Sequence, residues 1–326
     1  MTTIFHEDDG DLGALDGQRI AVVGYGNQGR CWALNLRDSG LDVSVHGRRE
    51  DTQDVARADG FEAFDIPTAG TADVLCILVP DDVIPMIDVT PGPDALVIIA
   101  SGYAFAFDRW VPDCDRAMIA PRMLGPEVRE TYLEGIGFMS GIGIEHDKTG
   151  TAKARTLAVA RGLGALGQGG IEMSARQEAV LDLGVEQLLA PALRATNLAF
   201  TQVMAENGIP MEGILAELFL SGEVERTFKR LRLEGYAAQL NHHSPASQYG
   251  QLSRGTEFPT EPTVQIMRRL TDHIASGGFA DEWDDERDHG YPKLEALRAE
   301  MVGDAVVEWE RDLRTQLGET AARNRG

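Results

Sequence analysis

The stretch Ala21-Val22-Val23-Gly24-Tyr25-Gly26-Asn27-Gln28-Gly29 determines the fold expected for the first half of the chain. The apolar run Ile20–Val23 leads directly into a G-x-G-x-x-G motif. Between a strand and a helix, the first glycine allows a tight turn and the second lets the backbone approach a pyrophosphate. The third allows helix and strand to pack closely, and the helix N-terminus offers N–H groups to the anion. The motif predicts that a dinucleotide is bound by Gly24, Tyr25, Gly26, Asn27, Gln28 and Gly29; the alternative is a plain glycine-rich turn.

Short apolar runs continue after this motif. They are Val43–Val45, Val74–Val79, Leu96–Ala100 and Met118–Ala120. Runs that are apolar throughout are typical of strands buried on both faces of a parallel sheet covered by helices. Crossover helices are expected at Trp32–Ser39 and Thr52–Ala58, and the segments Ile136–Ile144 and Thr151–Gly162 would extend the sheet and close the domain.

From about Ala175 the strand pattern gives way to long segments with helical periodicity. They are Arg176–Leu198, Met211–Leu233, Pro262–Ala275 and Lys293–Leu317. We therefore predict an α/β fold, a Rossmann-like doubly wound parallel sheet, followed by an all-α C-terminal domain. The boundary is expected near residue 180, with a dinucleotide-binding domain at 1–180 and a helical domain at 181–326.

Composition excludes several classes of protein. The 326 residues carry a formal net charge of -22, which opposes binding to nucleic acid. No stretch approaches the roughly 20 apolar residues that span a bilayer, so no membrane association is expected. The N-terminal sequence has no signal-peptide pattern, and we expect a cytoplasmic protein. Three isolated cysteines form neither a disulfide framework nor a zinc motif.

The end of the second expected strand bears on cofactor choice. An acid is usual there when NAD is bound, but this chain reads His46-Gly47-Arg48-Arg49-Glu50-Asp51. The guanidinium groups of Arg48 and Arg49 suit a 2′-phosphate by charge and geometry. Glu50 and Asp51 could instead accept hydrogen bonds from a ribose. NADP(H) is the expected cofactor, NAD(H) is the alternative, and a solvated pair of arginines is a third interpretation.

Asp182 and Glu186 stand four residues apart in a largely apolar helical segment. At this spacing their side chains face the same way. Carboxylates on an apolar surface are costly unless they are neutralised, and Mg²⁺ is a suitable partner. An ordinary exposed acidic face is the alternative that the spacing alone leaves open.

Taken as a whole, the chain resembles the short form of the ketol-acid reductoisomerase family. The resemblance covers nearly the entire chain. The matching segments are Ala21–Gly29, Ala33–Gly40, Met118–Pro121, Asp182-Leu183 with Glu186-Gln187, Gln248–Gly250, Gly278–Trp283, Gly290–Pro292 and Ala296–Arg298. The resemblance implies NAD(P)H and Mg²⁺ as cofactors. It also implies an alkyl shift in an acetohydroxy acid followed by reduction of the resulting ketone, and a homodimer or higher oligomer with shared active sites.

Carried over by position, the resemblance places Asp182 and Glu186 on metal-binding acids and Ser244 on the serine that binds substrate. Glu223 matches a metal acid contributed by the partner subunit, whereas Phe219 stands where the family carries another. Other registers would bring in Glu217 or Glu225.

Two further positions depart from the family. Ser101 stands in place of a histidine, and Arg122 stands in place of a lysine. Arginine keeps the charge but cannot donate a proton at neutral pH, and the loss of histidine removes a group that titrates near pH 7. His242 and His243 could replace these groups, as metal ligands or as a proton donor, or could be solvated loop residues.

These departures favour reduction over isomerisation. Alkyl migration depends on two metal ions, whereas hydride transfer needs one cation or Arg122 on the ketone oxygen, a carboxylate and a positioned nicotinamide. We expect a reductase that acts on a small 2-keto or 2-keto-3-hydroxy acid in a specialised pathway. Asp182, Glu186, Arg122 and Ser244 would be catalytic, and Asp182, Glu186 and Glu223 would hold one cation. Ser101, like the glycine loop, Arg48 and Arg49, is expected to bind the cofactor. The alternatives are a true reductoisomerase of branched-chain amino-acid synthesis and an inactive dinucleotide-binding homologue.

Overall fold

The computed structural model describes residues 1–258, 260–302 and 305–317. The chain divides into two compact units, Met1–Asp182 and Leu183–Gly326. Within the described ranges, none of the helices combines the length and hydropathy that a bilayer crossing requires.

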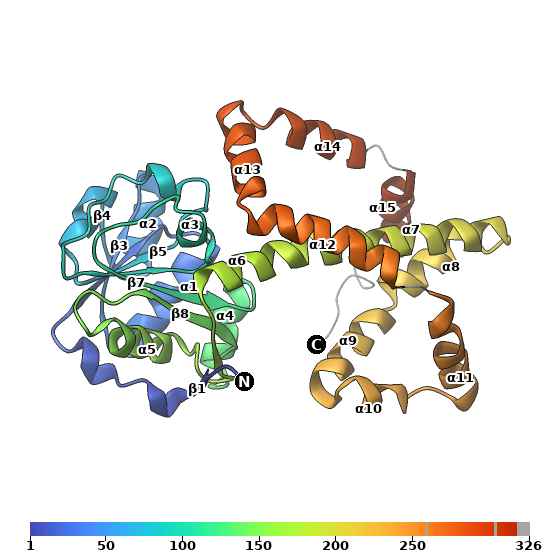
Figure 1. Ribbon diagram of the computed structural model, residues 1–326, viewed down its shortest axis with the longest axis horizontal. Helices are drawn as coiled ribbons and strands as arrows, with labels where there is room; N and C mark the ends of the chain where they lie inside the picture. The colour runs from blue at the N-terminus through green and yellow to red at the C-terminus, as the bar shows by residue number, and fades with distance from the viewer. Residues whose placement is uncertain (259, 303–304, 318–326) are drawn as a thin grey trace. The chain divides into compact units, whose positions relative to one another are not determined.

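The first unit is built on one sheet (Figure 1). In the described residues it has nine strands, in the order β1-β9-β8-β7-β6-β5-β2-β3-β4. The strands are β1 (Ile4–Phe5), β2 (Arg19–Val23), β3 (Asp42–His46), β4 (Glu62–Phe64), β5 (Val74–Ile77), β6 (Leu96–Ile99), β7 (Asp115–Pro121), β8 (Ser140–His146) and β9 (Gly170–Glu172).

The chain runs from β2 towards one edge through β3 and β4, and then returns to place β5, β6 and β7 on the other side of β2. These strands are parallel to one another. The order therefore reverses between β2 and β5, and in open α/β sheets ligands bind at such a point, outside the carboxyl ends of the strands.

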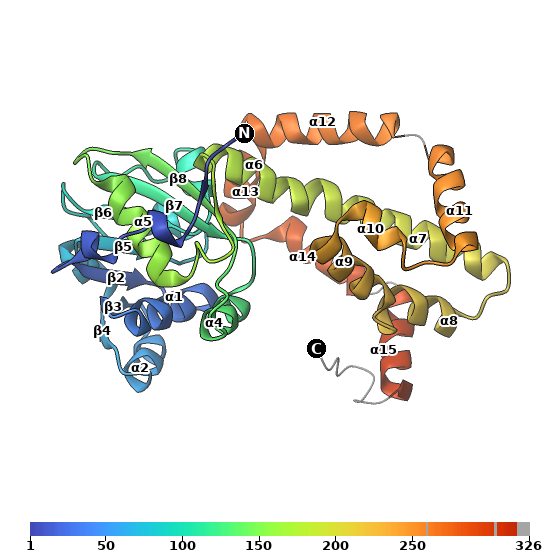
Figure 2. The same ribbon diagram turned by 90° about the horizontal axis from the view of Figure 1, so that it is seen from below.

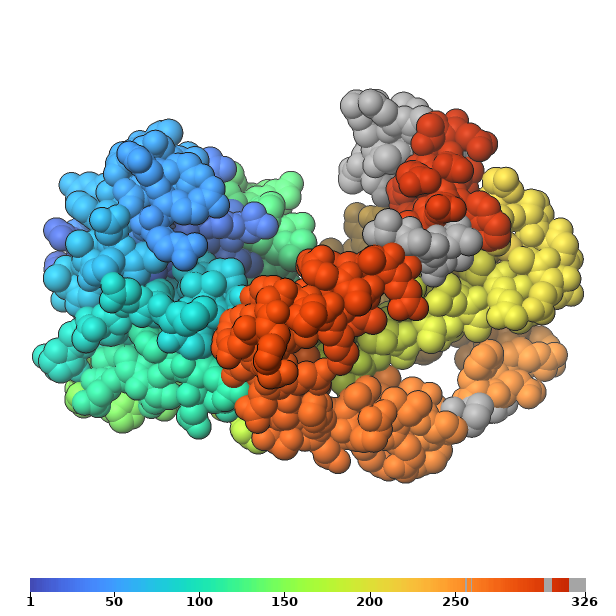
Figure 3. Space-filling view, turned by 90° about the horizontal axis from the view of Figure 1, so that it is seen from above, coloured from blue at the N-terminus to red at the C-terminus, as the bar shows by residue number. Residues whose placement is uncertain are grey.

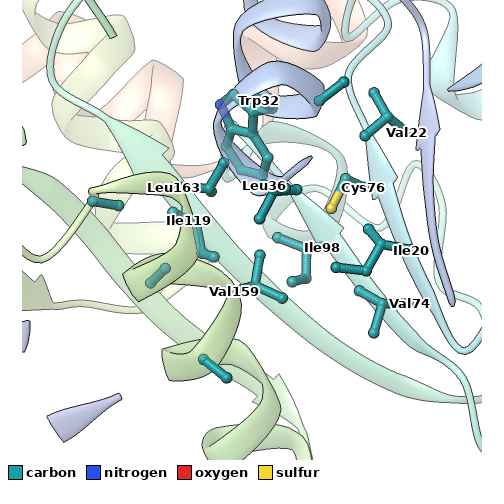
Figure 4. Packing of buried hydrophobic residues seen from close by; sticks show 14 of the residues in the cluster. Ile20, Val22, Trp32, Leu36, Val74, Cys76, Ile98, Ile119, Val159 and Leu163 are labelled. Atoms are coloured by element: carbon teal, nitrogen blue, oxygen red, sulfur yellow. The ribbon is translucent and has the colours of Figure 1, made fainter. Parts of the chain in front are cut away.

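Helices cover both faces of this sheet. In the first unit they are α1 (Asn27–Asp38), α2 (Glu50–Ala58), α3 (Tyr103–Ala106), α4 (Gly125–Leu133), α5 (Ala152–Leu163) and α6 (Ala175–Gly184). Figures 1 and 2 show α1 and α5 beside the sheet. Trp32 and Leu36 of α1 pack there against Ile20, Val74 and Ile98 (Figure 4).

The opposite face is buried by different residues of the same strands. Ala21, Leu75 and Val97 pack there with Ala104 and Phe105 of α3. Because successive strand residues point to opposite faces, burial on both sides explains why the strands are apolar throughout. The doubly wound α/β class predicted from sequence is confirmed.

Three strands were not expected from the sequence: β1, β4 and β9 are only two or three residues long. Edge strands such as β1 and β4 gain most of their stability from pairing rather than from burial, so they leave little apolar pattern. The sheet is also not parallel throughout, because β8 pairs antiparallel to β7 and β1 antiparallel to β9.

The second unit is helical. Its α-helices are α7 (Ala190–Glu206), α8 (Met211–Leu215), α9 (Glu223–Glu234), α10 (Tyr236–Leu240), α11 (Pro245–Arg254), α12 (Glu261–Ala275), α13 (Gly278–Asp288), α14 (Pro292–Val302) and α15 (Ala305–Leu317). π-Helical turns occur at Val185–Leu189 and Ala216–Leu220.

Two long helices predicted from sequence are interrupted. The segment Met211–Leu233 breaks at Gly222, whose φ of 75° lies in the left-handed region that favours glycine. The segment Arg176–Leu198 contains the π-helical turn Val185–Leu189 and runs on to Glu206. In the segment Lys293–Leu317, residues 303–304 lie outside the described ranges.

All three cysteines of the chain are buried as free thiols in the first unit: Cys31, Cys76 and Cys114. Burial raises the pKa of the Cys76 thiol to about 12 and that of Cys114 to about 11. These side chains fill the core and form no disulfide.

Candidate functional site

The glycine loop joins β2 to α1 at the reversal point of the sheet. Gly24 has a φ of +96°, and a Cβ added there would lie 2.7 Å from the carbonyl oxygen of Leu78. A Cβ at Gly29 would lie 2.0 Å from the oxygen of Gly24. A Cβ at Gly26 would meet no atom within 4 Å. Close contacts within the protein therefore require glycine at positions 24 and 29. Gly26 instead borders open space into which the pyrophosphate of a ligand could fit.

A pocket of about 910 Å³ opens beside this loop. Its volume is that of a site for a large organic ligand. It is lined by Gly24, Tyr25, Gly26, Gly47, Arg48, Arg49, Thr52, Asp65, Ile66, Pro67, Leu78, Val79, Pro80, Val83, Met86, Ile87 and Asp88. Of the expected cofactor residues, Asn27, Gln28, Gly29 and Ser101 do not line it: Asn27, Gln28 and Gly29 begin α1, and Ser101 follows β6.

Tyr25 of the glycine loop is anchored away from solvent. Its hydroxyl donates to Asp59 Oδ2 at 2.9 Å, and Arg30 Nε donates to the same oxygen at 2.7 Å. Burial, together with the Asp59 charge, raises the pKa of Tyr25 well above its usual value, so the phenol stays protonated. Asp59, which follows α2, thus fixes the loop, a role that the sequence pattern does not reveal.

The two arginines after β3 differ in their surroundings, although both line the pocket. Arg49 forms a two-bond ion pair with Asp51. Arg48 is exposed, and no described residue forms an ion pair with it. His46 takes the place of the usual ribose-binding acid: it is buried and bonds to Thr68 Oγ1 at 3.0 Å. Burial lowers the pKa of His46, so its ring is neutral.

A second group of polar residues gathers where β7 ends. Arg122 is paired with Glu178 and lies 3.4 Å from Asp182 Oδ1, both on α6. Glu178 is 2% exposed, and its other oxygen accepts the N–H of Gly102 at 2.6 Å. Burial raises the pKa of Glu178, while Gly102 and Arg122 oppose that rise. Sequence reasoning missed Glu178, although its spacing of four residues before Asp182 would have indicated it.

Asp81 and Ser101 lie at the neighbouring strand ends, after β5 and β6. The Ser101 hydroxyl donates to Asp81 Oδ2 at 3.3 Å and accepts the N–H of Tyr103 at 3.2 Å. Burial, reinforced by the charges of Glu178 and Asp182, raises the pKa of Asp81 to about 7. Asp81 was also missed from sequence, because only the sheet order brings it next to Ser101.

The remaining expected site residues belong to the second unit. Glu186 is exposed within the π-helical turn Val185–Leu189, and Glu223 is exposed at the start of α9. The side chain of Ser244 caps α11 by accepting the N–H of Ser247 at 3.3 Å. Among the described residues, no three His, Cys, Asp or Glu side chains gather as a metal-binding group.

The two candidate histidines are engaged by protein groups. His242 Nε2 lies 2.6 Å from Glu234 Oε2, and His243 Nε2 lies 2.9 Å from Gln239 Nε2. Both histidines therefore have contacts within the helical unit that account for them without a metal ion.

A glycine loop at the reversal point of the sheet, a pocket beside it and a charged group at the adjoining strand ends define the class. The first unit belongs to the Rossmann-type folds that bind dinucleotides, and a helical unit follows it in the chain. Residues 14–169 match the NADPH-binding domain of acetohydroxy acid isomeroreductases, and residues 176–319 match the C-terminal domain of ketol-acid reductoisomerases. The chain belongs to the ketol-acid reductoisomerase family.

Individual relatives agree with this assignment. The chain is 35% identical over 318 residues to a putative ketol-acid reductoisomerase 3 of Saccharolobus solfataricus, with 94% of this chain and 95% of that protein covered. It is 34% identical to a ketol-acid reductoisomerase (NADP(+)) of Caldivirga maquilingensis, with 93% and 97% covered.

A solved structure is also similar along almost the whole chain. It is an NADH-preferring ketol-acid reductoisomerase from an uncultured archean, with a TM-score of 0.86 and 29% identity. The match covers 96% of this chain and 98% of that one. The predicted family and the prediction of an NAD(P)-dependent enzyme of this type are confirmed, and the chain carries the family's NADPH-binding domain.

Proposed function

We propose that the protein uses NADPH to reduce the ketone of a small 2-keto or 2-keto-3-hydroxy acid in a specialised pathway. The observation that carries this proposal is the group Arg122–Glu178–Asp182 at the strand ends. A cation held by a buried carboxylate next to a dinucleotide pocket suits an anionic substrate with a ketone that gains negative charge during hydride transfer.

In this proposal each residue has a separate role. The glycine loop holds the pyrophosphate, and its backbone N–H groups bind the anion. Arg122 binds the substrate carboxylate or the developing oxyanion, and Glu178 fixes the direction of its guanidinium. Ser244 donates its hydroxyl hydrogen to the substrate while its oxygen caps α11.

Mg²⁺ would be held by Asp182, with Glu186 and Glu223 completing the proposed set. Mg²⁺ commonly binds through one or two carboxylates and keeps several waters, so a complete protein cage is not required. The Asp182 side chain is 50% exposed, and its Oδ1 lies 3.4 Å from Nη1 of Arg122. The other carboxylate oxygen fits a hard cation. When bound, the cation would polarise the substrate carbonyl as a Lewis acid.

We assign the nucleotide preference to Arg48. Arg49 is already neutralised by Asp51, so Arg48 supplies the unpaired positive charge in the pocket. Replacing Arg48 by alanine is expected to raise the KM for NADPH about tenfold and to leave the KM for NADH within about twofold, since only NADPH carries the 2′-phosphate. Steady-state kinetics with both nucleotides measure this.

Arg49→Ala is the matched control for the change at Arg48, with a smaller expected effect on NADPH because its guanidinium is held by Asp51. An equal rise in KM for both nucleotides in Arg48→Ala would assign Arg48 to another part of the cofactor. The NADH-preferring structural relative makes NADH the alternative cofactor.

We further propose residues 1–180 as the dinucleotide-binding domain and residues 181–326 as the metal, substrate and dimerisation domain of a cytoplasmic homodimer or higher homo-oligomer. A row of apolar residues along α7 and the turn before it supports association: Leu189, Leu193, Phe200 and Val203 are 41–48% exposed. Figure 3 shows α8 and the end of α7, in yellow, at the surface of this face. Exposed apolar stripes of this kind mark interfaces; sedimentation of the purified chain as a monomer would contradict the proposal.

One pair of assays tests the proposed reaction. The enzyme with NADPH and Mg²⁺ is given either acetolactate or its already rearranged keto-hydroxy product. Turnover of the rearranged compound alone supports a reductase, because the reduction needs no alkyl shift. Turnover of acetolactate would show instead a complete reductoisomerase, the activity for which the relatives are named. Nucleotide binding without turnover of any keto acid would reject both.

A further inference from the structure

We propose that Asp81 and Ser101 form the proton-donating pair of the active site, in which Ser101 hands a proton to the substrate oxygen and is reprotonated by Asp81. This inference rests on the proposed reduction and adds the source of its proton. Arg122 cannot be the proton donor, because a guanidinium does not lose its proton at neutral pH.

The position of the pair supports this role. Pro80 lines the nucleotide pocket, and Asp81 is the next residue. Ser101 bonds to Asp81 across the ends of the adjacent strands β5 and β6. Gly102, which follows Ser101, donates its N–H to Glu178, the residue that holds Arg122. Hydrogen bonds and adjacent residues therefore link the cofactor pocket, the pair and the substrate-binding cation without a break.

Charge balance explains why one carboxyl here carries a proton. Asp81 faces the carboxylates of Glu178 and Asp182 from α6, and Asp82 from its own segment, while Arg122 is the one cation paired within the described group. Glu178 has both Arg122 and the Gly102 N–H, which favour its ionised form. Among the described residues, the Ser101 hydroxyl is the hydrogen-bond donor that offsets the burial of Asp81. These contacts therefore favour a proton on Asp81 over one on Glu178.

The proton transfer balances with hydride transfer. Hydride leaves NADPH and forms a C–H bond at the ketone carbon, and the carbonyl electron pair moves to oxygen. When Asp81 is protonated, the bond between the two groups reverses and the Asp81 O–H donates to Ser101 Oγ. The substrate oxygen then takes the Ser101 hydroxyl proton as Ser101 Oγ takes the proton of Asp81. NADPH is oxidised to NADP⁺, the ketone is reduced to an alcohol, and Asp81 is left as a carboxylate that water reprotonates.

The test is the pH dependence of kcat/KM for ketone reduction at saturating Mg²⁺. The wild-type rate is expected to fall about tenfold per pH unit above an apparent pKa, because the acid must be protonated. Asp81→Asn should lower turnover about a hundredfold at neutral pH and remove this basic limb. Ser101→Ala should lose as much, and the double variant no more, because the two groups act in one transfer. A cation at Asp182 would lower the apparent pKa of this limb. The test therefore depends on whether the limb is present and not on the pH at which it falls.

Asp82→Asn is the matched control, since it removes a neighbouring negative charge and keeps both members of the Ser101–Asp81 bond. It should keep the basic limb and shift it to lower pH, because a charge that holds the Asp81 proton is gone. A limb that persists in Asp81→Asn, or a loss below about threefold, would overturn the proposal.

A direct titration separates this inference from the proposed reaction. Difference infrared spectra between wild type and Asp81→Asn should show a carboxyl band that disappears as pH rises through neutrality, whether or not a substrate is turned over. Absence of that band would refute the role of Asp81 while leaving the reductase intact. A normal titration in a protein that reduces no ketone would refute the reductase instead.

Discussion

Replacing Gly26 by alanine is expected to abolish cofactor-dependent turnover while leaving the fold intact. A Cβ at Gly26 meets no protein atom within 4 Å and enters the open space beside the pocket. It would therefore hinder only a ligand whose pyrophosphate approaches the backbone. The expected result is a loss of NADPH binding of at least about a hundredfold, with a melting temperature within about two degrees of wild type. Nucleotide titration by fluorescence and thermal unfolding without ligand measure the two effects.

Gly29→Ala is the contrasting variant in the same loop. Its Cβ would lie 2.0 Å from the carbonyl oxygen of Gly24, a backbone atom that cannot turn aside. Overpacking of this kind should cost about 3 kcal/mol or more, or roughly 6–12 °C in melting temperature. If Gly26→Ala destabilised the fold as much as Gly29→Ala, the open space at Gly26 would not be a ligand site.

Arg122→Leu is expected to combine the loss of activity with a loss of stability that depends on pH. Glu178 is 2% exposed and would be left as a buried carboxylate without its cation. Removing one partner of a buried pair costs about 3–5 kcal/mol. Turnover should fall at least about a hundredfold, because the positive charge proposed to stabilise the oxyanion is also gone.

The sign of the pH effect follows from Glu178. Burial already raises its pKa, and without Arg122 that pKa would rise further. The destabilisation of Arg122→Leu should therefore be full at pH 8, where Glu178 must be charged, and smaller at pH 5, where it takes up a proton. Urea unfolding at the two pH values measures this. Arg57→Leu, at an exposed pair with Asp54, is the control and should change stability by less than about 1 kcal/mol at either pH.

The parts of the fold that could be predicted are those that leave a pattern within one segment of the sequence. The glycine loop can be recognised from sequence because Gly24 and Gly29 are required by close backbone contacts, while Gly26 borders open space. The central strands are apolar throughout because they are buried on both faces. Beyond these, β1 and β4 depend on pairing partners that are distant in sequence, and the π-helical turns leave no mark in the helical period.

The candidate site divides in the same way. Glu178 could have been found, because it precedes Asp182 on α6 by the same four residues that separate Asp182 from Glu186. Asp81 and Asp59 could not, because their partners Ser101 and Tyr25 meet them only once the strands are ordered. The metal set proposed from the resemblance includes Glu223, which the resemblance assigns to the partner subunit. Among the described residues, no three His, Cys, Asp or Glu side chains gather as a metal-binding group.

The three free cysteines have a practical consequence for following this enzyme in solution. Each thiol is buried, and for Cys76 and Cys114 burial also suppresses ionisation. Maleimide dyes react with accessible thiolates, so the native chain should label poorly. One cysteine introduced at an exposed site would therefore carry the single fluorophore, and the three native cysteines would not have to be removed first. The protein is in this sense suited to site-specific spectroscopy.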